Sequence, residues 1–205
     1  EESATLVIDS ADVQSFKDIV IEPRTNYTIG RFEVPMINDV SRVVLMVTDV
    51  SRKNNPGATV AGMDWNLGFL DNRLFSNGQS VRSDNNNITG NAIRFNWGYM
   101  DPFWWSVRFW YGHYDDEFNV NDLGYLRRND TNWMGGRVEF RKQEPWGRFI
   151  YNDLEFKYMQ EWRGDGLPLE RELEIEQNNL FTNYRRAGFF SKVFLPAYND
   201  EDIFR

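Results

Sequence analysis

The sequence lacks cysteine entirely and contains a single histidine, His113, among 205 residues. The missing cysteines exclude disulfide bonds, thiolate metal sites and cysteine nucleophiles. One histidine without a second gives poor support to a zinc centre or a Ser-His-Asp triad, and its place near the end of a predicted strand suggests an interfacial polar residue. We therefore predict no catalytic residue, metal ligand or cofactor, and we expect that the chain is not an enzyme.

Long apolar runs and an excess of positive charge are also missing. No stretch reaches the roughly 18 apolar residues of a membrane-spanning helix, and the mean hydropathy is -0.62. The formal net charge of -8 at pH 7 speaks against a nucleic-acid partner, because phosphate binding needs clustered Lys and Arg. The chain begins at Glu1 without a charged and then apolar leader, so we expect a mature or truncated piece of a longer protein.

Large apolar residues alternate with small or charged residues over most of the sequence. Met63, Trp65 and Leu67, for example, alternate with Asp64 and Asn66. Because successive side chains of a strand point to opposite faces, this pattern predicts β-strands with one apolar and one polar face, whereas a helix would need spacings of three and four. We expect strands near residues 27–36, 41–50, 59–70, 73–82, 91–99, 103–114, 132–142, 147–162, 167–179 and 184–195.

The length of these segments favours a membrane protein. Several run about ten residues or more, which a tilted strand needs to cross a bilayer. Aromatic residues make up 16% of the chain and gather near segment ends, as in interfacial girdles. We predict an all-β fold, an antiparallel up-and-down transmembrane β-barrel or a part of one with about ten strands. A soluble antiparallel sandwich also alternates with one dry face, and it stays open as the alternative.

The predicted barrel occupies the whole chain as one domain, or as a fragment of one. Residues 1–20 would form an approach segment or partial strands, residues 21–196 the barrel strands and residues 197–205 a tail. Outer-membrane barrels have short turns on one side and longer loops on the other. We expect short turns at 37–39, 71–72, 100–102 and 144–146, and longer loops at 51–58, 83–90 and 115–131.

Three stretches carry a resemblance to a known family. They are Ile21 to Arg31 (IEPRTNYTIGR), Gly62 to Leu67 (GMDWNL) and Phe118 to Asp130 (FNVNDLGYLRRND), of which the last is the most specific. Together they resemble the barrel region, domain of unknown function 5916, of bacterial proteins that carry an N-terminal family 9-type carbohydrate-binding module. The resemblance implies the outer membrane of Gram-negative bacteria and a link to polysaccharide handling. The carbohydrate-binding module is missing here, so sugar binding passes to no residue of this chain.

The most specific of these stretches also holds the candidate binding motif, formed by Asn121, Asp122, Gly124, Arg127 and Arg128. A loop with this composition could fold into the lumen, where the Arg pair would grip an anionic ligand or pair with carboxylates of the wall. The structural alternative is that Asp122 and Gly124 supply turn chemistry while the arginines neutralise buried acids. We favour the structural alternative, because no second half of a site can be named.

Acidic residues are concentrated in two other places. One is an oxygen-rich loop whose spacing matches no EF-hand, so that we expect solvated side chains and no bound calcium. The other is one face of a predicted strand, which would give a lumen a negative stripe that favours cations. We favour the alternative, a strand surface that faces solvent or a partner and is balanced across the barrel by Arg94, Arg108, Arg137, Arg141 and Lys157. The loop residues are Asp115, Asp116, Glu117, Asn119, Asn121 and Asp122, and the stripe residues are Glu170, Glu172, Glu174 and Glu176.

Two sets of residues would suit a carbohydrate-active protein. Glu155 and Glu161 are conceivable as a glycosidase pair, although carboxylates are common on polar strand faces and catalysis is the weaker interpretation. Tryptophans near strand ends are girdle residues in a barrel and sugar-stacking platforms in a soluble protein. These are Trp104, Trp105, Trp110 and Trp146.

We therefore expect a non-enzymatic outer-membrane β-barrel that serves as a channel, an anchor or a surface-display platform. Its partners would be outer-membrane lipid and polysaccharide held by a carbohydrate-binding module outside this chain. A soluble carbohydrate-binding or glycan-processing β-sandwich remains the alternative function.

Overall fold

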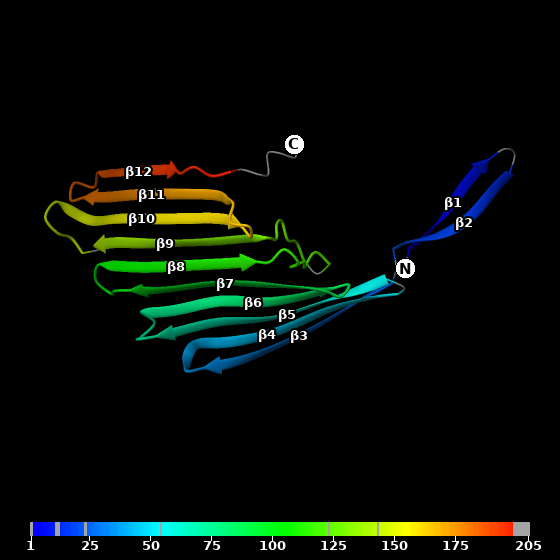
Figure 1. Ribbon diagram of the computed structural model, residues 1–205. Coiled ribbons are helices and arrows are strands. Elements are labelled where there is room, and N and C mark those ends of the chain that lie inside the picture. The colour runs from blue at the N-terminus through cyan, green and yellow to red at the C-terminus, as the bar shows by residue number, and fades with distance from the viewer. Residues whose placement is uncertain are drawn as a thin grey trace.

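A computed structural model describes residues 2–10, 13–22, 24–53, 55–122, 124–142 and 144–198. Its elements are all β-strands, which lie side by side in one large sheet and one hairpin (Figure 1). The strands are β1 (Glu2–Ser10), β2 (Val13–Glu22), β3 (Thr25–Met36), β4 (Asn38–Arg52), β5 (Asn55–Phe69), β6 (Leu74–Asn85), β7 (Ile88–Met100), β8 (Trp105–Tyr114), β9 (Thr131–Lys142), β10 (Phe149–Arg163), β11 (Pro168–Phe181) and β12 (Arg186–Phe194).

The large sheet contains ten strands, β3 to β12, in the order of the sequence. Each of the eight interior strands pairs antiparallel with the strand before and the strand after it, and β3 and β12 pair with one neighbour each. The predicted up-and-down arrangement of about ten strands is therefore confirmed. Strands β1 and β2 pair antiparallel with each other in a separate two-stranded sheet. Among the described residues, no helix is long and apolar enough to cross a membrane.

The ten-stranded sheet is not closed. Within the described residues, β3 and β12 form its two edges, and no backbone pairing joins them. An unpaired edge leaves a row of backbone N–H and C=O groups without strand partners. Water can hydrogen-bond these groups, whereas in lipid each of them would cost free energy. The described residues therefore form an open sheet, and the predicted closed transmembrane barrel is not observed in them.

The strand register sorts the side chains onto two chemically different faces. Residues opposite each other in neighbouring strands share a face, and the pairs Phe32–Leu45 and Phe156–Ile175 lie on the side we call the apolar face. Its large exposed residues are Phe32, Leu45, Val47, Met63, Phe69, Trp97, Phe140, Phe156, Leu173, Ile175, Phe189 and Val193, which are 37% to 64% exposed.

The opposite side, the polar face, carries most of the charged and amide side chains of the strands. Register pairs such as Arg42–Asn66, Asp64–Gln79 and Lys157–Glu174 lie on it. The alternation predicted from the sequence therefore produces one apolar and one polar surface over the central strands. At the two edges, Ile29 of β3 and Phe190 and Phe194 of β12 are exposed on the polar face.

The two ends of the sheet differ in their connections, because the one long connection between the described strands lies at one end only. Five short connections, β3–β4, β5–β6, β7–β8, β9–β10 and β11–β12, lie at the left end in Figure 1, which we call the turn end. At the other end, the loop end, sixteen residues (115–130) connect β8 to β9 as predicted. The longer loops predicted at 51–58 and 83–90 are wrong, because β4 runs to Arg52, β5 starts at Asn55, and β6 and β7 are separated by two residues.

The tight turn between β6 and β7 explains the error at 83–90. Asn86 and Asn87 have φ values of 55° and 64°, the left-handed conformation of a two-residue primed turn. Asparagine tolerates this conformation, and the turn matches the twist of the strands that it joins. The polar residues before and after it therefore continue as paired strands, although their composition is typical of a loop.

We predict that the variant Asn87→Leu destabilises the fold by about 1 kcal/mol, because a branched side chain in the left-handed region clashes with the backbone. The variant Asn87→Gly is the matched control and should leave stability within about 0.5 kcal/mol of the parent. Urea unfolding followed by circular dichroism measures both. Equal midpoints for the leucine and glycine variants would contradict the prediction.

Candidate functional site

The long connection between β8 and β9, residues 115–130, folds back over the polar face at the loop end. We call it the β8–β9 loop. Its first residue is tied to β7: the Asp115 N–H donates to the Asn91 carbonyl at 3.1 Å, and the Asn91 N–H donates to Asp115 Oδ2 at 2.6 Å. At its other end, Asp130 Oδ1 accepts the Gly164 N–H at 3.0 Å. One end of the loop is thus hydrogen-bonded to strand β7 and the other end to the β10–β11 connection.

An aromatic side chain anchors the loop to the strands below it. Phe118 is buried, and its ring lies 5.4 Å from the ring of Tyr114. A Cβ atom on Gly90 would come within 2.2 Å of the Phe118 backbone, so the absence of a side chain in β7 permits this close approach. The Asn119 N–H donates to Ser83 Oγ at 3.1 Å on β6. The loop is therefore packed against the sheet by both apolar and polar contacts.

Asp122, a residue of the predicted binding motif, makes the strongest polar anchor of the loop. Arg52 Nη2 contacts Asp122 Oδ1 at 2.5 Å, and Asn85 Nδ2 donates to Asp122 Oδ2 at 2.7 Å. Arg52 ends β4 and Asn85 ends β6. One carboxylate thus connects the loop to two strand ends, and charge-assisted hydrogen bonds of this kind are among the stronger ones in proteins.

The other members of the motif have separate places. Asn121 Oδ1 accepts the Leu126 N–H at 2.8 Å, which closes the loop on itself. Gly124 has no positive φ and a Cβ there would meet only one atom, at 3.9 Å, so the predicted turn role of this glycine is not required by the backbone. Arg127 and Arg128 line a pocket of about 650 Å³ together with Asn85, Asn86, Asp116, Glu117, Asn119, Asn121 and Asn129.

The acidic residues of the loop do not converge. Asp115 and Asp122 point to different partners, and Asp116 and Glu117 are exposed. In the part of the chain that the structure describes, no three His, Cys, Asp or Glu side chains gather closely enough to hold a metal ion. The carboxylates of this loop therefore act singly, as hydrogen-bond acceptors or as solvated groups.

Two of the four glutamates in the stripe on β11, Glu172 and Glu174, pair with lysines of the two neighbouring strands. Lys157 of β10 contacts Glu172 at 3.3 Å and Glu174 at 2.9 Å. Lys192 of β12 contacts Glu174 at 3.1 Å and also Glu172, whose side chain is only 2% exposed. A carboxylate so deeply buried is stable only when it is paired, and here two ammonium groups share two carboxylates.

Glu155 and Glu161 do not form a catalytic pair. They lie on one face of β10 six residues apart, a separation of roughly 20 Å along a strand, whereas glycosidase carboxylates stand within about 10 Å. Glu155 contacts Arg137 at 3.2 Å, and Glu161 accepts the Thr131 hydroxyl at 3.0 Å. Each glutamate is thus engaged by its own neighbour on β9.

The tryptophans divide between the two faces. Trp110 lies on the polar face, in register with Gly135 of β9, where a Cβ would come within 2.3 Å of the indole. The prediction that Trp110 belongs to an outward girdle with Trp104, Trp105 and Trp146 is therefore wrong for this residue. Its ring covers Gly135 of the next strand. Sequence alternation alone could have placed Trp110 on the polar face, because Arg108 and Gly112 lie two residues before and after it.

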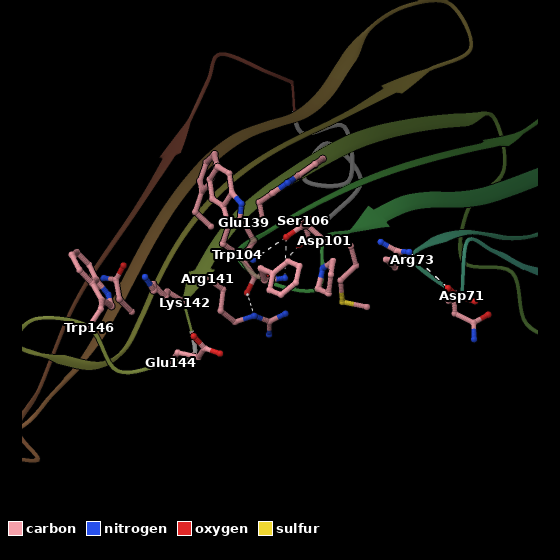
Figure 2. A pocket seen from close by; sticks show the side chains of 17 residues that line it. Asp71, Arg73, Asp101, Trp104, Ser106, Glu139, Arg141, Lys142, Glu144 and Trp146 are labelled. Carbon is pink, nitrogen blue, oxygen red and sulfur yellow. Dashed lines mark hydrogen bonds and ion pairs between the residues drawn. The ribbon is translucent and has the colours of Figure 1, made fainter.

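Trp104 and Trp146 lie at the turn end, around a hollow of about 890 Å³ (Figure 2). The Trp104 and Phe140 rings stack at 5.9 Å, and Lys142 Nζ lies 5.5 Å from the Trp146 ring centre. We call this hollow the turn-end pocket. Acidic and basic groups alternate along it: Asp71 with Arg73 and Glu139 with Arg141 form ion pairs at 3.7 and 3.6 Å.

His113 lies on the apolar face close to the loop end. Its Nδ1 is 2.7 Å from Asn132 Oδ1 on the adjacent strand β9. The neighbouring polar residues on the same face suggest a boundary between apolar and polar surface at this level of the sheet.

Residues 1–205 match the model of a protein family described as a domain of unknown function, DUF5916. The chain belongs to this family. The predicted resemblance to that domain is thereby confirmed, whereas its description states neither a membrane location nor a carbohydrate-binding partner. Comparison with curated proteins and with solved structures found no match.

Three residues of this DUF5916 chain that contact the acidic side chains were not predicted from the sequence. Arg52 and Asn85 meet Asp122 from 70 and 37 residues away, and Lys192 meets the stripe from β12. The strand register would have located Lys192, because it stands directly opposite Glu174. No local pattern marks Arg52 or Asn85 as partners of the loop.

We predict that the variant Asp122→Asn releases the β8–β9 loop. Loss of a partly buried charged contact worth about 1 kcal/mol should raise the open population about fivefold. Trypsin cleavage after Arg127 and Arg128, quantified by mass spectrometry, reports this opening. The control variant Asp116→Asn removes the same charge from an exposed side chain of the same loop. Equal cleavage rates in the two variants would show that Asp122 does not hold the loop.

Proposed function

We propose that this chain forms all or part of an outer-membrane β-barrel, and that it serves as a non-enzymatic channel, anchor or surface-display platform. The observation that carries the proposal is the exposed apolar face. Eight of the ten strands contribute a large exposed residue to it, from Phe32 on β3 to Val193 on β12. Soluble monomeric proteins rarely expose apolar patches of more than a few hundred Å², so a surface of this breadth favours contact with lipid.

Strand length supports the same assignment. The sheet strands are 9 to 15 residues long, and those from β4 to β11 are all 10 residues or longer. A tilted strand of about 9 to 11 residues is enough to cross the hydrocarbon core.

The polar face suits the interior of such a barrel. Its charges are matched locally, as in Arg137–Glu155 and in the cluster of Lys157, Glu172, Glu174 and Lys192. The β8–β9 loop packs on this same face and covers Ser83 and Gly90. Charges that lie on the lumen side and pair with each other avoid the high cost of charge in lipid.

The soluble-sandwich alternative has less support. Apart from the β1–β2 hairpin, all described strands belong to a single sheet, so the described residues offer no second layer to cover the apolar face. The link to polysaccharide remains a proposal that rests on family resemblance. It would act through a carbohydrate-binding module outside this chain.

The first test is refolding from urea into detergent micelles and, in parallel, into plain buffer. We expect a β-sheet signal in far-UV circular dichroism only with detergent, together with a gel mobility that changes on boiling. The physical reason is that the apolar face needs a nonaqueous surface to cover it. Folding to a stable monomer in plain buffer would contradict the proposal. Failure to fold in either medium would contradict autonomous barrel formation by these residues.

A pair of variants on one strand tests which face meets lipid. We predict that Ile175→Arg on the apolar face costs about 2 to 4 kcal/mol of stability in micelles, because it places a charge in the apolar layer. Asn178→Arg, three residues later on the polar face opposite Asp153, should change stability by less than about 0.5 kcal/mol. Urea titration in micelles measures both. Similar losses for the two variants would count against a lipid-facing apolar side.

A further inference from the structure

Each of the five connections at the turn end carries an exposed large apolar side chain. Ile37, Leu70, Phe103 and Tyr184 are 70%, 62%, 78% and 82% exposed, and Trp146 is exposed as well. They belong in turn to the connections β3–β4, β5–β6, β7–β8, β11–β12 and β9–β10. Turn tips in contact with water are normally polar or glycine-rich. A recurring apolar residue at all five tips indicates a common apolar surrounding.

Three of these residues occupy their positions at a conformational cost. Ile37, Leu70 and Tyr184 have φ values of 44°, 51° and 61°, in the left-handed region that suits glycine or asparagine. The loop end satisfies the same requirement with Asn86 and Asn87. Bulky side chains in this region persist where something else favours them, so the apolar character of these tips has a function beyond turn geometry.

The apolar face is more apolar near the turn end than near the loop end. Near the turn end, apolar residues such as Phe69 and Leu74 reach the last paired positions of their strands. Near the loop end, the same face carries Asp49, Arg82 and Asp84 on strands that are still paired. The apolar band is therefore displaced toward the turn end, and the strands continue beyond it as polar strands at the loop end.

The loop end itself carries charge. In the β10–β11 connection, the Asp165 carboxylate accepts hydrogen bonds from the Arg163 side chain and from the Leu167 N–H. These two hydrogen bonds lower the pKa of Asp165 to about 2. Asp165 is exposed and remains ionised over the usual pH range. A turn of this kind belongs in water.

The turn-end pocket has the chemistry of a membrane interface. Indole rings with neighbouring cations prefer the level of the lipid headgroups, and here Lys142 lies against Trp146 beside the stacked pair Trp104 and Phe140 (Figure 2). The ion pair Asp71–Arg73 of the β5–β6 connection lines the same hollow. Mixed charges next to aromatic rings match a zwitterionic headgroup, which carries both signs itself.

We propose that the turn end is seated in the headgroup layer of a phospholipid leaflet, with Ile37, Leu70, Phe103, Trp146 and Tyr184 as its contacts, while the loop end projects into water. This orientation rests on the proposed function, because it presupposes that the apolar face meets lipid. A lipid leaflet surrounds a barrel on every side, and all five connections carry the feature. A protein partner or a second copy would contact only a sector of them.

The absence of cysteine allows an experiment with single labels. Cysteine is introduced singly by Ile37→Cys, Leu70→Cys and Tyr184→Cys at the tips, by Asn86→Cys at the loop end, and by Met63→Cys on the apolar face. Each variant carries a polarity-sensitive fluorophore and is refolded into vesicles of phosphatidylethanolamine and phosphatidylglycerol. The quenchers are a nitroxide on the lipid headgroup, a nitroxide on the acyl chain, and iodide present on both sides of the membrane.

We expect the headgroup nitroxide to quench the three tip labels at least about twofold more than the label at residue 86, which iodide should quench best. The acyl-chain nitroxide should quench the label at residue 63. If residue 63 is quenched by lipid while the tips respond to iodide like residue 86, the orientation is wrong and the proposed function stands. If residue 63 escapes lipid quenchers, the proposed function fails as well. Tips shielded from every quencher would indicate a protein contact and would overturn the inference.

Discussion

Antiparallel register is the constraint on which the rest of this structure depends. Backbone pairing brings residues of neighbouring strands opposite each other, so Phe156 stands beside Val138 and Ile175 while Lys157 stands beside Arg137 and Glu174. A shift by one residue in any strand would move its charges to the apolar face and its apolar residues among the ion pairs. The two surfaces therefore hold the register in place as much as the register creates them.

The polar face shows how such a surface remains stable with many ionised groups. Glu139, Glu155 and Glu176 stand in one row across three strands, where like charges repel. Arg137 pairs with Glu155, and Arg141 pairs with Glu139, so the cations of neighbouring rows offset that repulsion. Asp122 of the β8–β9 loop forms a further ion pair on this face, with Arg52 of β4. Several charges on this face are therefore satisfied within local ion pairs.

The sequence predicts the strands and their faces because these depend on a two-residue period that is present in the chain itself. Phe156 and Lys157 are assigned to opposite faces by counting alone. The connections are harder: the polar residues around Asn86 and Asn87 are typical of a loop, yet backbone hydrogen bonds form there regardless of side-chain polarity. The contacts of Asp122 with Arg52 and Asn85 depend on where a sixteen-residue loop comes to lie, which no local pattern contains. Closure of the sheet likewise depends on what meets β3 and β12, and pairing partners of edges are not encoded in alternation.

The order of the ten strands follows the order of the chain, and this has a consequence for assembly. From β4 onward, every strand pairs with the strand that has just preceded it, so each new strand can add to an existing edge without a search for a distant partner. Growth by such steps is modular: the sheet could gain or lose a hairpin at either edge while every interior pairing stays as it is. The β8–β9 loop is the exception to this edge-by-edge growth, because Phe118 packs against Gly90 of β7 and not against the strand formed last. The placement of this loop therefore depends on strands β4, β6 and β7, which all precede it in the chain.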